Sequence, residues 1–132
     1  MSWDEAGKAL LNHLANMTDV PDIAYENYSY EPTSGQTYVK EQLMPIKSDA
    51  LTLNGNIARN DMTYQVLVYI PKDDSARNGM VLADKICTQF KAGTRLTNGS
   101  TTVEVLNATQ LGGFNSDAWY CIPVRIDALY FG

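Results

Sequence analysis

The sequence is poor in the side chains on which most enzymes depend. It has one histidine, His13, and two cysteines, Cys87 and Cys121, that lie far apart in the chain. One histidine excludes a metal site built on a histidine pair and leaves any nucleophile–histidine–acid triad dependent on His13 alone. His13 falls on or beside the polar face of a predicted helix, where a solvated residue is the simpler interpretation. No G-x-S-x-G elbow or phosphate-binding G-x-x-x-x-G-K-[ST] loop is present. We therefore expect neither enzymatic activity nor a cofactor.

Runs of basic residues and long apolar segments are missing as well. The chain has 15 acidic and 10 basic residues and a formal net charge of −5, so it lacks the positive surface that nucleic acid or an anionic membrane attracts. No window approaches the roughly 18 apolar residues of a membrane span. Asp4 and Glu5 precede the first apolar stretch, unlike the basic start of a signal peptide. These absences predict a protein of a reducing cytoplasm, with unpaired cysteines.

The apolar content of the chain is sufficient for one folded domain. Of its 132 residues, 45% are hydrophobic, and this length is typical of a single domain. From Met62 to Ile70 every second residue falls on one apolar face, which predicts a strand with that face buried. Pro71 lacks the N–H that a strand ladder needs, so the strand should end there.

A helix is predicted directly after this strand. Asp73, Asp74 or Ser75 can serve as its N-cap, and Gly93 suits a left-handed residue after its end. Between them, apolar residues recur at helical spacing. This predicted buried stripe consists of Met80, Ala83, Ile86, Cys87 and Phe90. The strand and the helix should therefore pack face to face.

A second amphipathic helix is predicted at the N-terminus. Ser2 and Glu5 match a capping box, in which the Ser2 hydroxyl accepts from the Glu5 N–H and the Glu5 carboxylate reaches back. One apolar stripe follows and consists of Trp3, Ala6, Leu10, Leu14 and Met17. The helix should end near Asp19 and Pro21.

Further strands are predicted on both sides of the central unit. Ile23–Tyr30 and Tyr38–Ile46 alternate loosely, and Pro45 in the second favours a sheet edge or a strand end. Ala118–Tyr130 alternates most regularly of the late segments, with Pro123 again suggesting an edge or a bulge.

Two turns are predicted between these strands. Asn98-Gly99 is a hairpin signal between short strands at 94–96 and 102–106. Gly112-Gly113 opens a further turn before the last strand.

The segment 47–61 is the least predictable part of the chain. Leu51–Leu53 could pair with Ile57 around Asn54-Gly55, a favoured hairpin turn. A long mobile loop is an equally good interpretation, and we expect a loop or hairpin arm that reaches away from the core. Taken together, the elements predict one α+β domain over residues 1–132, with an antiparallel or mixed sheet covered on one face by two helices.

Aromatic residues are the remaining notable feature. Eight tyrosines and two tryptophans occur, several of them on strand faces opposite the presumed core, and this pattern is typical of a protein–protein surface. Tyrosine also fills half-buried sheet positions in many β-rich domains, and the sequence leaves both interpretations open. The long 47–61 segment and the proline-marked strands favour a protein that assembles with others.

Four groups of residues occur in a characteristic order along nearly the whole chain. They are Ile23-Ala-Tyr-Glu-Asn27 with Tyr30, Pro32, Gly35 and Tyr38; Tyr64-Gln65-Val66 with Pro71; Ala83, Ile86, Phe90 and Gly93; and Trp119 with Ile122-Pro123-Val124. Together they resemble the tail terminator proteins of long-tailed bacteriophages. The chain departs from that pattern at Met62 and Thr63, where the family has a glycine, so the loop before them falls outside the resemblance.

The resemblance implies a virion structural protein without chemistry of its own. Such a protein forms a ring, usually of six copies, on the head-proximal end of the tail tube. The ring stops tube polymerisation and offers a surface to the head. The implied partners are further copies of itself, the major tail tube protein and a head–tail connector, and assembly takes place in the host cytoplasm. In a ring of this kind, one edge of each subunit meets a different edge of its neighbour.

Candidate contact residues follow from placing the predicted elements in such a ring. The proline-bearing strands should form the edges, and the 47–61 segment should lie along the tube end or a neighbouring subunit. The candidate interface residues are Tyr38, Lys40, Arg59, Tyr69, Trp119 and Arg125. The nearest alternative function is another neck or tail-completion protein, or a tube subunit. The alternative from another class is a small hydrolase or ligand-binding module whose tyrosines line a pocket.

Overall fold

The two segments with the most regular alternation become the central strands of the sheet. In a computed structural model, which describes residues 2–132, these are β3 (Ala58–Pro71) and β7 (Trp119–Phe131), and they pair antiparallel from Arg59 to Pro71. From Met62 to Ile70 the predicted inner face of β3 is at most 1% exposed. The matching face of β7, from Ile122 to Ala128, is equally buried. Both predicted faces are confirmed, and β3 ends at Pro71 as expected.

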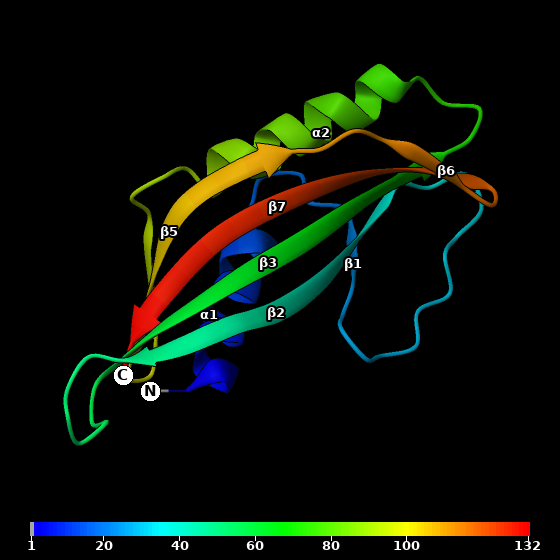
Figure 1. The fold of residues 1–132 in the computed structure, drawn as a ribbon. Coiled ribbons are helices and arrows are strands. Elements are labelled where there is room, and N and C mark those ends of the chain that lie inside the picture. Colours follow the sequence, from blue (N-terminus) through cyan, green and yellow to red (C-terminus); the bar gives the residue numbers. More distant parts are fainter. Residues whose placement is uncertain (1) are drawn as a thin grey trace.

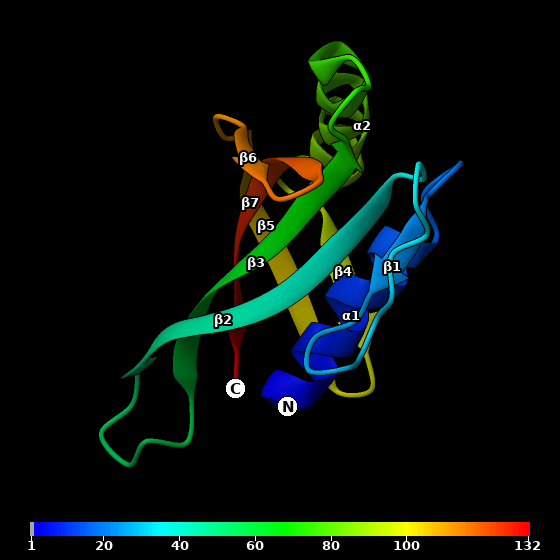
Figure 2. The same ribbon diagram turned by 90° about the vertical axis from the view of Figure 1, so that its right-hand side faces the viewer.

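The other elements extend this pair into a curled, mixed sheet with two helices on one face (Figures 1 and 2). The helices are α1 (Trp3–Ala15) and α2 (Ala76–Gln89). The remaining strands are β1 (Asp22–Ala24), β2 (Tyr38–Ala50), β4 (Arg95–Asn98), β5 (Thr101–Gln110) and β6 (Phe114–Ser116). The sheet order is β1-β2-β3-β7-β5-β4, with β6 paired to β7; β1 and β2 are parallel and the other pairs antiparallel. The predicted fold class is confirmed.

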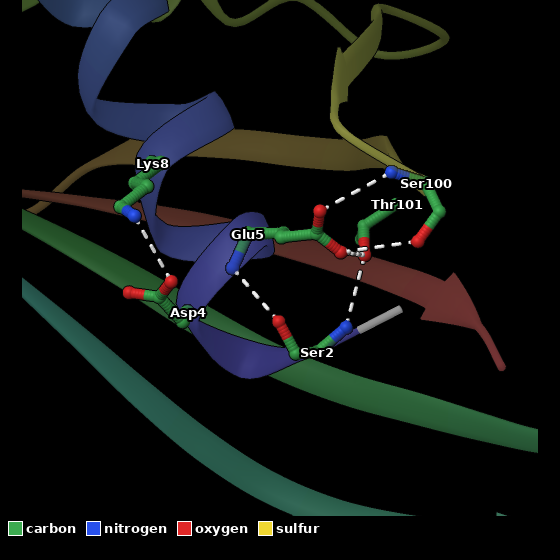
Figure 3. A network of polar contacts seen from close by, with 6 residues as sticks. All are labelled: Ser2, Asp4, Glu5, Lys8, Ser100 and Thr101. Carbon is green, nitrogen blue, oxygen red and sulfur yellow. Dashed lines mark hydrogen bonds and ion pairs between the residues drawn. The ribbon is translucent and has the colours of Figure 1, made fainter.

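Helix α1 begins at the predicted cap, but half of the predicted capping box is wrong. The Ser2 hydroxyl accepts from the Glu5 N–H at 3.1 Å. The Glu5 carboxylate, however, turns to the β4–β5 turn, where it accepts from the Ser100 N–H, the Ser100 hydroxyl and the Thr101 hydroxyl at 3.2, 3.2 and 3.0 Å (Figure 3). The Ser2 N–H donates to the buried Thr101 hydroxyl instead, at 2.9 Å. These hydrogen bonds, above all that from Thr101, lower the pKa of Glu5 and tie the start of α1 to the sheet.

Helix α2 is capped by Ser75, whose hydroxyl accepts from the Arg77 N–H at 3.2 Å. Its buried stripe differs from the prediction, because Met80 is 44% exposed and Cys87 is only partly buried. Gly79 faces the sheet instead, and a Cβ there would lie 2.7 Å from the Cδ1 of Ile122. A larger residue at this position would force the side chains of Ile122 and Ile70 to shift.

The two helices are joined through His13, which is half-buried and not the solvated residue expected. Its Nε2 lies 2.6 Å from the carbonyl oxygen of Gln89, and the Gln89 side-chain amide donates to the His13 carbonyl at 2.8 Å. The His13 ring also meets Phe90 edge to face at 5.0 Å. The histidine therefore contributes to helix packing.

The strand predicted for residues 23–30 is wrong beyond Ala24. Strand β1 stops at Ala24, and the backbone at Asn27 is left-handed, with φ of 60°, a conformation that a regular strand does not contain. The Glu26 N–H donates to the Glu41 carboxylate at 2.7 Å, and the Glu26 carboxylate accepts from the Leu43 N–H at 3.0 Å. Side chains thus replace strand pairing along this part of β2.

The two prolines within strands lie in different places. Pro45 is on the edge of β2 beyond the short pairing with β1, as predicted. Pro123 was predicted at an edge or a bulge, and the edge is wrong, since β7 lies between β3 and β5 and so does not form the sheet edge expected of it. Pairing of β7 with β5 ends at Val124 and pairing with β6 begins at Cys121, so the missing N–H of Pro123 falls in the break between two ladders.

The segment 47–61 forms a hairpin. Strand β2 continues to Ala50 and β3 starts at Ala58. We call residues 51–57 between them the hairpin tip; it projects beyond the body of the protein (Figures 1 and 2). The Leu51 N–H donates to the Ile57 carbonyl at 2.8 Å, so the tip begins with one more cross-strand hydrogen bond.

Candidate assembly surfaces

One face of the sheet has no helix over it, and we call it the open face (Figure 2). It is formed by every second residue of the central strands, since the alternate residues point into the core. The register places Tyr38 of β2 beside Tyr69 of β3, and Tyr69 beside Cys121 of β7. Nearer the hairpin tip the same register places Asp49 beside Arg59. Aromatic residues therefore lie at one end of the open face and charged residues at the other.

Six charged side chains line a shallow groove at the charged end. We call it the charged groove, and its charged residues are Lys47, Asp49, Arg59, Asp61, Arg125 and Asp127. Each of β2, β3 and β7 contributes a cation and an anion two positions apart, with nitrogen–oxygen distances of 3.0 to 3.1 Å. The Lys47–Asp49 pair is exposed on both sides, whereas the Asp61 and Asp127 side chains are 16% and 31% exposed. Ion pairs with exposed members contribute little to stability. They leave a charge-balanced surface that a partner can contact.

The structure brings the predicted Arg59 and Arg125 into this one groove from different strands. Sequence reasoning missed their partners, Asp61 and Asp127. A signal was available, because opposite charges at i and i+2 in a strand lie on the same face.

The aromatic end of the open face is a cluster of four rings, Tyr30, Tyr38, Tyr69 and Trp119. The Tyr38 and Tyr69 rings stack at 4.8 Å between centroids, and Trp119 meets Tyr38 edge to face at 5.1 Å. Tyr30, from the loop after β1, adds a third ring contact at 4.9 Å. The pKa of Tyr69 is raised to about 12, mainly by burial. The Cys121 thiol, which is hydrogen-bonded to the Tyr69 hydroxyl, raises this pKa further.

All six sequence-predicted candidates lie on the open face, but in separate groups. Tyr38, Tyr69 and Trp119 belong to the aromatic cluster. Arg59 and Arg125 belong to the charged groove. Lys40 lies between the two groups, exposed on β2 opposite Leu67.

The hairpin tip is a second surface that the body of the protein leaves uncovered. Its three large apolar side chains are exposed: Leu51 at 55%, Leu53 at 111% and Ile57 at 48%. Exposed apolar residues gathered at one place mark interaction sites in soluble proteins.

Asn60 holds the base of this hairpin in place and is only 5% exposed. Its Oδ1 accepts from the Ser48 hydroxyl on β2 at 2.6 Å. Its Nδ2 lies 3.3 Å from each of three carbonyl oxygens, those of Ala58, Tyr130 and Gly132. One side chain thus links β2, β3 and the end of β7.

Residues 2–132 bring together no group of three or more His, Cys, Asp or Glu side chains that could hold a metal ion. Within the same residues, no helix has the length and apolarity needed to cross a membrane.

Comparison with known proteins identifies the family. A family model described as phage tail terminator protein matches residues 5–127. The chain belongs to this family. It is a structural protein family, and its members are components of the virion tail.

Two solved structures resemble this tail terminator protein. One, which carries no descriptive name, has a TM-score of 0.78 and 20% sequence identity, covering 98% of this chain and 96% of the other. The second belongs to the virion of a native gene transfer agent particle, with a TM-score of 0.67 and 17% identity, covering 99% of this chain and 100% of that one. At these identities the likeness concerns the fold. No curated protein matches the sequence.

Proposed function

We propose that this protein forms a ring, of six copies, on the head-proximal end of the tail tube. The ring stops polymerisation of the tube and provides the surface to which the head connector binds. The observation that carries the proposal is the family match over residues 5–127. The partners are further copies of the chain, the major tail tube protein and a head–tail connector.

The surfaces described above support this proposal. A ring subunit needs at least two different contact surfaces, because each copy meets its two neighbours through different patches. This chain has the open face with its charged groove and, separately, the projecting hairpin tip. We assign the open face, with its six candidate residues, to contacts with subunits and tube, and the hairpin tip to a neighbouring subunit or the tube end.

Charge reversal in the groove tests this assignment. The double variant Arg59→Glu, Arg125→Glu leaves Asp61 and Asp127 facing further negative charge. The Asp61 and Asp127 side chains are only 16% and 31% exposed, so the reversal should lower the free energy of unfolding without preventing folding, which urea denaturation checks first. Ring formation and capping of purified tail tubes, followed by sedimentation and negative-stain microscopy, should be lost.

The matched control is Arg77→Glu, an exposed position on α2 away from the open face. It makes the same substitution at one arginine instead of two, and each single groove variant is compared with it; it should leave capping intact. Capping by the double variant at the wild-type level would remove the open face from the assembly contacts. Long tubes formed by the wild-type protein alone would identify it as a tube subunit instead.

A further inference from the structure

The hairpin tip contains one of three Asn-Gly pairs in the chain, which are Asn54-Gly55, Asn78-Gly79 and Asn98-Gly99. An asparagine side chain can be attacked at Cγ by the backbone nitrogen of the next residue. Glycine in that position leaves the approach open, because it has no side chain and a freely variable backbone. The three pairs lie in very different surroundings, so the other two serve as references for the pair at the tip.

At the tip, two donors hold the Asn54 amide oxygen. Its Oδ1 accepts from the Thr52 hydroxyl at 2.8 Å and from the Asn56 N–H at 3.2 Å. The second bond closes an Asx turn, which folds the Asn54 side chain back along the Gly55 backbone. Negative charge develops on this oxygen when a nucleophile adds to Cγ. Both donors therefore stabilise the transition state in the way that an oxyanion hole does.

The nucleophile, the Gly55 nitrogen, is equally accessible. Its N–H makes one exposed hydrogen bond, to the Thr52 carbonyl at 3.1 Å, which must open before the proton leaves. A Cβ added at Gly55 would meet nothing within 4 Å. Water and hydroxide can therefore reach this nitrogen.

The other two pairs lack these features. Asn78-Gly79 lies within helix α2, where Gly79 is buried and the Asn78 side-chain amide donates to the Asp74 carboxylate at 2.8 Å. The Gly79 nitrogen is therefore shielded from water and hydroxide.

The third pair lies in the β4–β5 turn. Asn98 is half-buried at the end of β4 and paired with Thr101. The Glu5 carboxylate occupies the space where a side chain on Gly99 would lie. A negative carboxylate at this point disfavours removal of the Gly99 backbone proton by hydroxide.

We propose that Asn54 is a modification site, at which the geometry of the tip promotes deamidation. The Gly55 nitrogen gives its proton to solvent and bonds to Asn54 Cγ. The Cγ–Nδ2 bond breaks and the nitrogen leaves as ammonia, with a proton taken from water, which yields a cyclic imide. Water then adds to either imide carbonyl and that carbon–nitrogen bond breaks, leaving an aspartyl or an isoaspartyl residue.

The net reaction consumes one water and releases one ammonia. It places a negative charge among the exposed apolar side chains of the tip, Leu51, Leu53 and Ile57. Contacts made by the tip should weaken as the protein ages.

The test is peptide mass mapping of the purified full chain during incubation in mildly alkaline buffer. Each event adds about 1 Da to its peptide, and isoaspartate is detected enzymatically. We expect position 54 to react faster than positions 78 and 98 in the folded protein, and all three to react at similar rates in urea. A rate at position 78 or 98 equal to that at position 54 in the folded protein would overturn the proposal.

Two variants test the role of the donor. Thr52→Val removes the hydroxyl at constant size and should slow the reaction at position 54 by about fivefold. Thr52→Ser keeps the hydroxyl and should restore most of the rate. If Thr52→Val reacts as fast as wild type, the reaction reflects exposure alone and the proposed activation by the turn is wrong.

Discussion

Replacing Asn60 by aspartate tests whether this one side chain anchors the hairpin. The change keeps the shape and the acceptor for the Ser48 hydroxyl but replaces a donor that faces three carbonyl oxygens, each at 3.3 Å. The carboxylate oxygen that replaces Nδ2 can donate no hydrogen bond to these carbonyl oxygens, and water does not reach it readily because Asn60 is only 5% exposed. A buried unsatisfied polar group costs about 1–3 kcal/mol, and more when charged, so we expect Asn60→Asp to lower the free energy of unfolding by about 3 kcal/mol at pH 7.

The assay is urea denaturation at several pH values. With a slope near 2 kcal/mol/M, a loss of about 3 kcal/mol lowers the urea midpoint by roughly 1.5 M. The carbonyls disfavour the charged form, so the new carboxyl has a pKa raised above the roughly 3.9 of the unfolded chain. The penalty is therefore full above the folded-state pKa and disappears as the pH falls towards about 4.

The control is Asn56→Asp in the exposed hairpin tip, which makes the same substitution where no buried carbonyl faces it. It should change stability by no more than about 0.5 kcal/mol. If Asn60→Asp is as stable as wild type at pH 7, the amide is turned the other way or does not anchor the hairpin.

Three further predictions concern the body of the protein. Tyr64→Phe should lower the free energy of unfolding, measured by urea denaturation, by about 1–3 kcal/mol. The reason is that the Glu41 carboxylate, which is 7% exposed, loses the Tyr64 hydroxyl that donates to it at 3.1 Å. An unchanged urea midpoint would show that the hydrogen bond is dispensable. Ile86→Ala removes a fully buried side chain of α2 and should lower the free energy of unfolding by about 2–5 kcal/mol in the same assay. A loss below about 1 kcal/mol would show that neighbouring side chains fill the space. Tyr69 should ionise only near pH 12 in an ultraviolet titration, because burial of the phenol is the main reason for its raised pKa. Ionisation near the normal value of about 10 would contradict the burial of the aromatic cluster.

Period-two alternation predicted the core face of β3 and β7 because both strands are buried on that side along their whole length. Helix starts were also predictable, since Ser2 and Ser75 cap through local hydrogen bonds. In these cases the cause of the structure lies within a few residues of the chain.

Errors arose where the deciding partner is distant in sequence. The Glu5 carboxylate binds Ser100 and Thr101, so its role could not be read from the capping box. Pro123 lies in a central strand because the ladders of β5 and β6 leave a break beside it. Met80 is exposed because the face of α2 that meets the sheet carries Gly79, next to the distant residues Ile70 and Ile122.

The candidate residues were predicted as a set but not as groups. Their types suggested contact residues, and the sheet register shows that aromatic and charged members lie at opposite ends of the open face. Which strands are neighbours depends on long-range pairing, so the grouping could not be derived from one sequence.

The most direct test of the proposed function is the native mass of the wild-type protein with and without purified tail tubes from the same phage. Sedimentation gives the mass, and negative-stain microscopy shows the tube ends. We predict one copy or a ring of six in solution, and a cap on one end only of each tube. A protein that stays monomeric and leaves both tube ends bare would contradict the proposed function.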